Sequence, residues 1–118
     1  MRLALAIFSY LLFLGTANAE TDASKFLKDY DAGTIAARKR LADDLLLVET
    51  GMSWVNVDIA EERKERPLYC PPNTLAPTGE RLVEILRKEI ESSPEESDRP
   101  VGFVLMRGLQ KAFPCQAK

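Results

Sequence analysis

Two cysteines, each beside a proline and just beyond a helical stretch, constrain the fold of this chain more than any other feature. Cys70 lies in the proline-rich break at residues 67–77, and Cys115 lies near the end in the sequence AFPCQAK. Because proline ends helices, each cysteine is expected at a helix boundary. A bridge between them would join two helix ends and close a long loop, which the chain-entropy model values at about 4 kcal/mol. Intermolecular pairing and free thiols are the alternatives.

Residues 1–19 have the pattern of a secretory signal peptide, which bears on the state of these cysteines. Arg2 is followed by an apolar run and then by the small residues Ala17-Asn18-Ala19. The run, of about 12 residues, is too short to span a bilayer roughly 30 Å thick, so no stable membrane insertion is expected. We predict cleavage between Ala19 and Glu20, which leaves residues 20–118 as one exported domain. An exported compartment is oxidising and favours a Cys70–Cys115 disulfide.

Four segments have the apolar periodicity of amphipathic helices: residues 24–33, 34–66, 78–93 and 99–113. In the second, an apolar residue recurs every three or four positions along one stripe: Leu41, Leu45, Val48, Met52, Val55 and Ile59. Leu46, Leu47 and Trp54 widen this stripe, so the helix is predicted to be buried on more than one side, with Trp54 in the core. No run alternates as a strand does. The predicted fold is all-α, a compact bundle of about four helices stapled by one disulfide.

The composition argues against several classes of function. The chain has no histidine, which removes the usual general base, the usual zinc ligand and the partner of a nucleophilic serine or cysteine. Its net charge is −2 with both signs interleaved, so nucleic acid is not an expected partner. The carboxylates at Asp43-Asp44 are interpreted as a solvated face, and Ser92-Ser93 near Lys88 as a helix cap rather than a Ser-Lys dyad. We predict a protein that is not an enzyme, with no catalytic, cofactor-binding or metal residues.

Four stretches carry a resemblance to a known family: GMSWVN, RPLYCPP, LAPTGERLVEILRKEIE and DRPVGFVLMRGLQKAFPC. Their order and spacing over residues 41–115 resemble the Tai family, the immunity proteins against type VI secretion amidases. The pairing of LYCPP with FPC is the most specific feature. Unlike characterised members, this chain lacks a second cysteine pair nearer its N-terminus.

The resemblance implies a helical protein in the periplasm of a Gram-negative bacterium. Such a protein would bind a peptidoglycan amidase effector and inhibit it by occluding its active site. A homodimer is a further expected association. The alternative function is a general cell-envelope stress or structural protein without a dedicated toxin.

Overall fold

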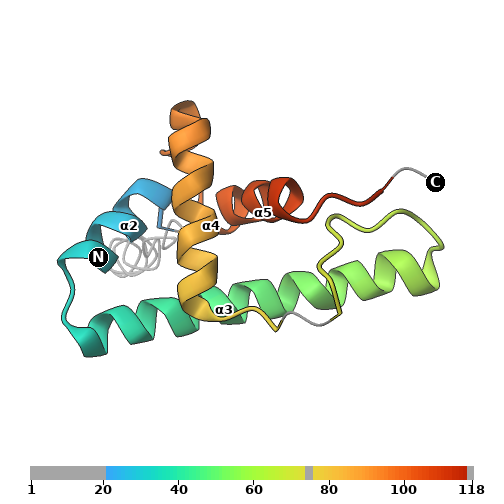
Figure 1. The fold of residues 1–118 in the computed structure, drawn as a ribbon, viewed down its shortest axis with the longest axis horizontal. Coiled ribbons are helices and arrows are strands. Elements are labelled where there is room, and N and C mark those ends of the chain that lie inside the picture. The colour runs from blue at the N-terminus through green and yellow to red at the C-terminus, as the bar shows by residue number, and fades with distance from the viewer. Residues whose placement is uncertain (1–20, 74–75, 117–118) are drawn as a thin grey trace, which may run out of the picture.

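The computed structural model describes residues 21–73 and 76–116, and its regular structure there is helical (Figure 1). The elements are α2 (Ala23–Ala32), α3 (Ile35–Val57), a π-helical turn (Asp58–Glu62), α4 (Gly79–Ser92), a 3-10 turn (Pro94–Glu96) and α5 (Val101–Ala112). This confirms the predicted all-α class with four helices in the described part. The predicted leader and its cleavage site, Ala19–Glu20, lie outside the described residues. None of the described helices is long and apolar enough to cross a membrane.

Side-chain caps decide where three of the helices begin. The hydroxyls of Thr34 and Thr78 each accept a backbone N–H three residues on, at 3.2 Å, and so start α3 and α4. At α2 the cap is Asp22, whose carboxylate accepts the N–H of Lys25 at 2.7 Å. Ser24, which by residue type could also cap this helix, instead donates its hydroxyl to Asp22. The stronger acceptor prevails because a carboxylate at a helix N-terminus also gains from the helix dipole.

The long second helix ends earlier than its sequence pattern predicts. The α-helix stops at Val57, one π-helical turn follows, and the chain leaves the helix through Lys64. Lys64 has a φ of 56°, which is the left-handed region. The N–H of Glu65 then bonds the carbonyl of Ile59 at 2.9 Å and closes the helix end. The charged residues that extend the pattern to 66 therefore belong to a turn and the start of the connection.

The core lies where α4 crosses α3 and packs beside α5 (Figure 1). It is built from the following buried side chains, with α2 closing one side: Ala23, Phe26, Leu27, Leu45, Tyr69, Leu82, Val83, Ile85, Leu86, Val101, Val104, Leu105 and Leu109. Two glycines permit this packing. A Cβ at Gly79 would lie 2.4 Å from the carbonyl oxygen of Ala42, and one at Gly108 would lie 2.8 Å from Cγ2 of Ile85. Both glycines hold α4 close to a neighbouring helix.

The connection after α3 doubles back along that helix and meets the C-terminal segment (Figure 1). Cys70 and Cys115, 45 positions apart, form a disulfide with a Cα–Cα distance of 4.9 Å. The N–H of Cys70 also bonds the carbonyl of Phe113 at 2.8 Å, and the guanidinium of Arg66 donates to the carbonyl of Cys115. The predicted pairing is therefore present. The bridge joins two irregular segments, each beyond its helix, rather than two helix ends directly.

Candidate functional site

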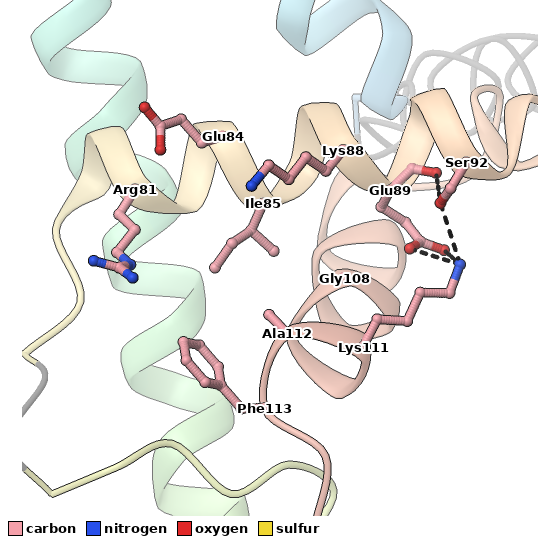
Figure 2. A pocket seen from close by; sticks show the side chains of 10 residues that line it. All are labelled: Arg81, Glu84, Ile85, Lys88, Glu89, Ser92, Gly108, Lys111, Ala112 and Phe113. Carbon is pink, nitrogen blue, oxygen red and sulfur yellow. Dashed lines mark hydrogen bonds and ion pairs between the residues drawn. The ribbon is translucent and has the colours of Figure 1, made fainter.

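A groove of about 580 Å³ runs between α4 and α5 (Figure 2). The following residues line it: Arg81, Glu84, Ile85, Lys88, Glu89, Ser92, Gly108, Lys111, Ala112 and Phe113. It forms because α5 approaches α4 closely at Gly108, while Ala112 one turn later is too small to fill the space beside Ile85. The apolar period of α5 favours Ala112 on the inward side of the helix, but the structure leaves it exposed at this groove.

One end of the groove holds a buried carboxylate with a single cation beside it. The Glu89 side chain is 2% exposed, and Nζ of Lys111 lies 2.9 Å from each of its two oxygens. The same ammonium donates to Oγ of Ser93 at 3.1 Å. A buried carboxylate without a partner is very costly, so Lys111 is required as its counter-ion. The lysine beside the serines is thus Lys111 and not the expected Lys88.

The serines at this end act as the sequence predicted. The N–H of Ser93 bonds the carbonyl of Glu89 at 2.8 Å, and the hydroxyl of Ser92 donates to the same carbonyl at 3.1 Å. Both groups satisfy the C-terminus of α4, which is a capping role. The Lys111 ammonium also donates to Oγ of Ser92 at 3.4 Å, so beside this serine the lysine is a hydrogen-bond donor held by Glu89 rather than a base.

The remaining cations of the groove, Arg81 and Lys88, point along its wall (Figure 2). Within the residues that the structure describes, neither side chain makes a hydrogen bond or an ion pair. The pattern of Glu84 and Lys88 at i and i+4 favours an ion pair, but the two side chains diverge, and both line the groove (Figure 2). The groove therefore presents unpaired positive charge.

A second surface is the outer face of α3, where large apolar side chains meet solvent. Trp54 is 69% exposed and Leu47 is 71% exposed, and both Val48 and Val55 are exposed beside them. Trp54 was predicted in the core, and α3 was predicted to be buried on more than one side. Both predictions are wrong, because α2, α4 and α5 all pack on the face that carries Ala42 and Leu45. Gly51, in the middle of the exposed face, has no atom within 4 Å of the position of a Cβ.

A buried polar cluster fixes the connection that follows α3. The Tyr69 hydroxyl donates to Oε1 of Glu49 at 2.9 Å, with Glu49 6% exposed. The Asn56 amide donates to the carbonyl of Tyr69 at 2.9 Å and accepts the N–H of Leu68 at 2.8 Å. Burial, then the hydrogen bond to Glu49, raises the pKa of Tyr69 well above its usual value. Sequence reasoning missed Glu49, because a glutamate between Val48 and Thr50 looks like part of a solvated face.

The acidic residues Asp31 and Asp43 pair with separate cations and do not form one site. Asp31 forms a two-pronged pair with Arg87 at 2.7 and 3.0 Å, and that guanidinium lowers the pKa of the Asp31 carboxyl. Asp43 pairs with Lys39 on the same helix at 2.6 Å. Within the described residues, no three acidic or cysteine side chains are grouped so that they could hold a metal ion.

Residues 13–115 match the family model of the Rap1a immunity proteins. The chain belongs to this immunity protein family. The chain matches no curated protein and no solved structure. Membership confirms the predicted immunity class at the level of the family. The narrower assignment to the Tai proteins, with an amidase as target, stays a prediction.

Proposed function

We propose that this protein is a periplasmic immunity protein that neutralises a peptidoglycan amidase delivered by type VI secretion. The observation that carries the proposal is the family match over most of the chain. Inhibition would require no chemistry from the protein, because covering the mouth of the amidase cleft excludes the cell-wall substrate. The protein would reach the periplasm after cleavage between Ala19 and Glu20, and mass spectrometry of periplasmic material should find a chain that starts at Glu20. Recovery of the uncut chain from membranes would contradict this step.

The fold suits tight binding, because little of it has to be ordered on association. The disulfide, the Glu49–Tyr69 hydrogen bond and the Asn56 amide tie residues 68–70 to α3 and to the C-terminal segment. A preorganised surface loses less conformational entropy on binding, so more of the contact energy appears as affinity. An inhibitor that must outlast the toxin also needs slow dissociation. We therefore expect an affinity in the nanomolar range, as is common for standard-sized, well-packed interfaces.

The decisive experiment is capture from periplasmic extract followed by an activity titration. The mature protein, residues 20–118, is immobilised, and captured proteins are identified by mass spectrometry. The captured hydrolase is then assayed on purified peptidoglycan with increasing amounts of the protein, and inhibition should be complete near a one-to-one ratio. Suppose that no cell-wall hydrolase is captured and that deletion leaves cells no more sensitive to neighbours of the same strain. The alternative, an envelope stress or structural protein, would then replace the proposal.

We further propose that the exposed face of α3 joins two copies of the chain. The face is symmetric in sequence about Gly51: Leu47 and Val48 precede it by four and three positions, and Trp54 and Val55 follow by three and four. In an antiparallel pair related by a two-fold axis at Gly51, Leu47 and Val48 of one copy meet Val55 and Trp54 of the other. Such an interface is self-complementary, as two-fold symmetry requires. The bare backbone at Gly51 permits close approach.

At each end of this face the antiparallel arrangement places two carboxylates opposite each other, with one cation beside them. Asp44 precedes Gly51 by seven positions, and Asp58 follows it by seven with Arg63 held on its carboxylate at 2.9 Å. Antiparallel copies would bring the Asp44 carboxylate toward Asp58, and the Arg63 guanidinium between them would offset the repulsion of the two carboxylates. Light scattering on the mature protein should give the mass of a dimer, and Trp54→Glu should give a monomer of unchanged helicity. A Trp54→Glu variant that stays dimeric would refute this interface. If wild type is a monomer and Trp54→Glu abolishes capture of the effector, the face binds the effector instead of a second copy.

A further inference from the structure

The groove between α4 and α5 holds positive charge that no other part of the described chain neutralises. It has five charged side chains on its walls: Arg81, Lys88, Lys111, Glu84 and Glu89. Glu89 is already paired with Lys111, which leaves Glu84 as the one unpaired carboxylate among the lining residues (Figure 2). Arg81 and Lys88 remain without partners in the described residues. The groove is therefore cationic, although the whole chain has a net charge of −2.

The same groove has an apolar floor between the two cations. Ile85 lies midway between Arg81 and Lys88 on α4, and Gly108, Ala112 and Phe113 form the α5 side (Figure 2). Gly108 is in close contact with Ile85, whereas Ala112, one turn later, is small and leaves space that an incoming apolar side chain can fill. The volume of about 580 Å³ is within the range of roughly 300–1,000 Å³ seen for ligand sites. A ligand that matches this surface needs both negative charge and an apolar group.

The geometry points to a peptide ligand in an extended conformation. Arg81 and Lys88 are seven positions apart on one helix, which places their backbones about 10 Å apart along its axis. In an extended chain alternate side chains lie on one face, so acidic residues four positions apart, about 13 Å, flank an apolar side chain on that same face, and the long side chains of Arg81 and Lys88 can reach both. We propose that the groove binds a segment of the effector in which two acidic residues, four positions apart, flank an apolar side chain midway between them. This inference rests on the proposed immunity function and identifies the chemistry of its partner.

The first test compares two charge-reversed variants of the mature protein against the amidase captured by wild type. Arg81→Glu/Lys88→Glu changes the groove, and Lys28→Glu/Lys64→Glu makes the same change in net charge at exposed residues outside it. All four side chains lack partners in the described residues, so both variants should melt like wild type. The groove variant should bind the amidase at least about tenfold more weakly, and the control within about twofold, because close charge pairs across interfaces have large coupling energies. Equal binding by the two variants would overturn the proposal.

The second test fills the groove without changing its charge. Ala112→Phe places a ring beside Ile85 at an exposed helix end, where it should leave the fold intact. It should weaken capture of the amidase about as much as the loss of the two cations does. Unimpaired capture by a folded Ala112→Phe protein would show that no apolar group enters the groove.

A third test does not need the amidase, and it separates the ligand chemistry of the groove from the immunity function. The probe is the peptide acetyl-Gly-Asp-Gly-Leu-Gly-Asp-Gly-amide, titrated into isotope-labelled mature protein, with its Asn-for-Asp analogue as control. Amide signals of residues 81–92 and 108–113 should shift with the acidic peptide only. If wild type captures no amidase but these shifts appear, the immunity function fails and the groove chemistry stands. If the signals respond instead to a free cell-wall stem peptide, and the groove variant still binds the amidase, the groove serves cell-wall peptides and the proposal is wrong.

Discussion

The Tyr69 hydroxyl donates a hydrogen bond to the Glu49 carboxylate at 2.9 Å, and this contact joins the connection after α3 to the helix itself. Tyr69 is 1% exposed, so the loss of its hydroxyl would leave a buried carboxylate without a donor. We expect Tyr69→Phe to lower the free energy of unfolding by about 1–3 kcal/mol. Glu49→Gln keeps an acceptor and should cost less. Urea denaturation measures both, and equal midpoints for wild type and Tyr69→Phe would contradict the role given to this bond.

The raised pKa of Tyr69 also predicts how stability changes at alkaline pH. Burial and the bond to Glu49 raise the pKa in the folded state above the unfolded value of about 10. Above that pH the unfolded chain releases the proton and the folded chain keeps it, so stability is full below pH 10 and falls as the pH rises beyond it. Urea midpoints from pH 8 to 11 should therefore decline for wild type and decline less for Tyr69→Phe. Parallel curves for the two proteins would count against a buried, protonated Tyr69.

The disulfide is expected to supply a large part of the stability of this small domain. Cys70→Ser/Cys115→Ser removes the bridge without leaving a thiol, and it should lower the free energy of unfolding by about 2–5 kcal/mol. The single variant Cys70→Ser should show one reactive thiol at Cys115 and a similar loss. Reduction of wild type should reproduce the result, whereas reductant should not affect the double variant. Identical melting of oxidised wild type and the double variant would exclude a structural role.

The two glycines Gly79 and Gly51 predict opposite responses to the same substitution. A Cβ at Gly79 would lie 2.4 Å from the carbonyl oxygen of Ala42, so Gly79→Ala must push α4 away from α3 and should cost about 1–3 kcal/mol. Gly51 has open space around it, so Gly51→Ala should stabilise α3 by about 0.5–1 kcal/mol through helix propensity. Both should be measured in the Trp54→Glu background, where the α3 face is unpaired. A stabilising Gly79→Ala would show that the two helices do not approach as closely as described.

The left-handed backbone of Lys64 offers a stabilising substitution. At a φ of 56° a side chain costs roughly 1 kcal/mol, and glycine has no such cost. Lys64→Gly should therefore raise the unfolding midpoint, whereas Lys64→Ala, which removes the same charge but keeps a Cβ, should not. Thermal unfolding of the three proteins provides the comparison. A gain from alanine equal to that from glycine would assign the effect to charge rather than to backbone strain.

Local chemistry in the sequence was enough to predict several parts of this fold. Thr34 and Thr78 start helices because each side-chain oxygen accepts the free backbone N–H three residues later. This capping bond is local and does not depend on the tertiary structure. Cys70 and Cys115 were expected to pair because an exported chain with two cysteines has one intramolecular choice. The inward faces of α4 and α5 followed from their apolar period, apart from Ala112 at the end of α5.

Which side chains of α3 are buried depends on how many helices pack around it, and the sequence of α3 alone does not specify this number. Apolar residues lie around most of the circumference of α3, so the apolar pattern does not distinguish which of Leu45 and Trp54 is buried. The other described helices pack on one side only, and this buries Leu45 while leaving Trp54 69% exposed. The burial of Glu49 has the same origin, because only the returning connection brings Tyr69 over it. The groove likewise exists only because Gly108 lets α5 reach Ile85. These features depend on contacts between segments that are distant in the sequence. A local pattern predicts where a helix forms and which of its faces is apolar, but not which segments pack against it.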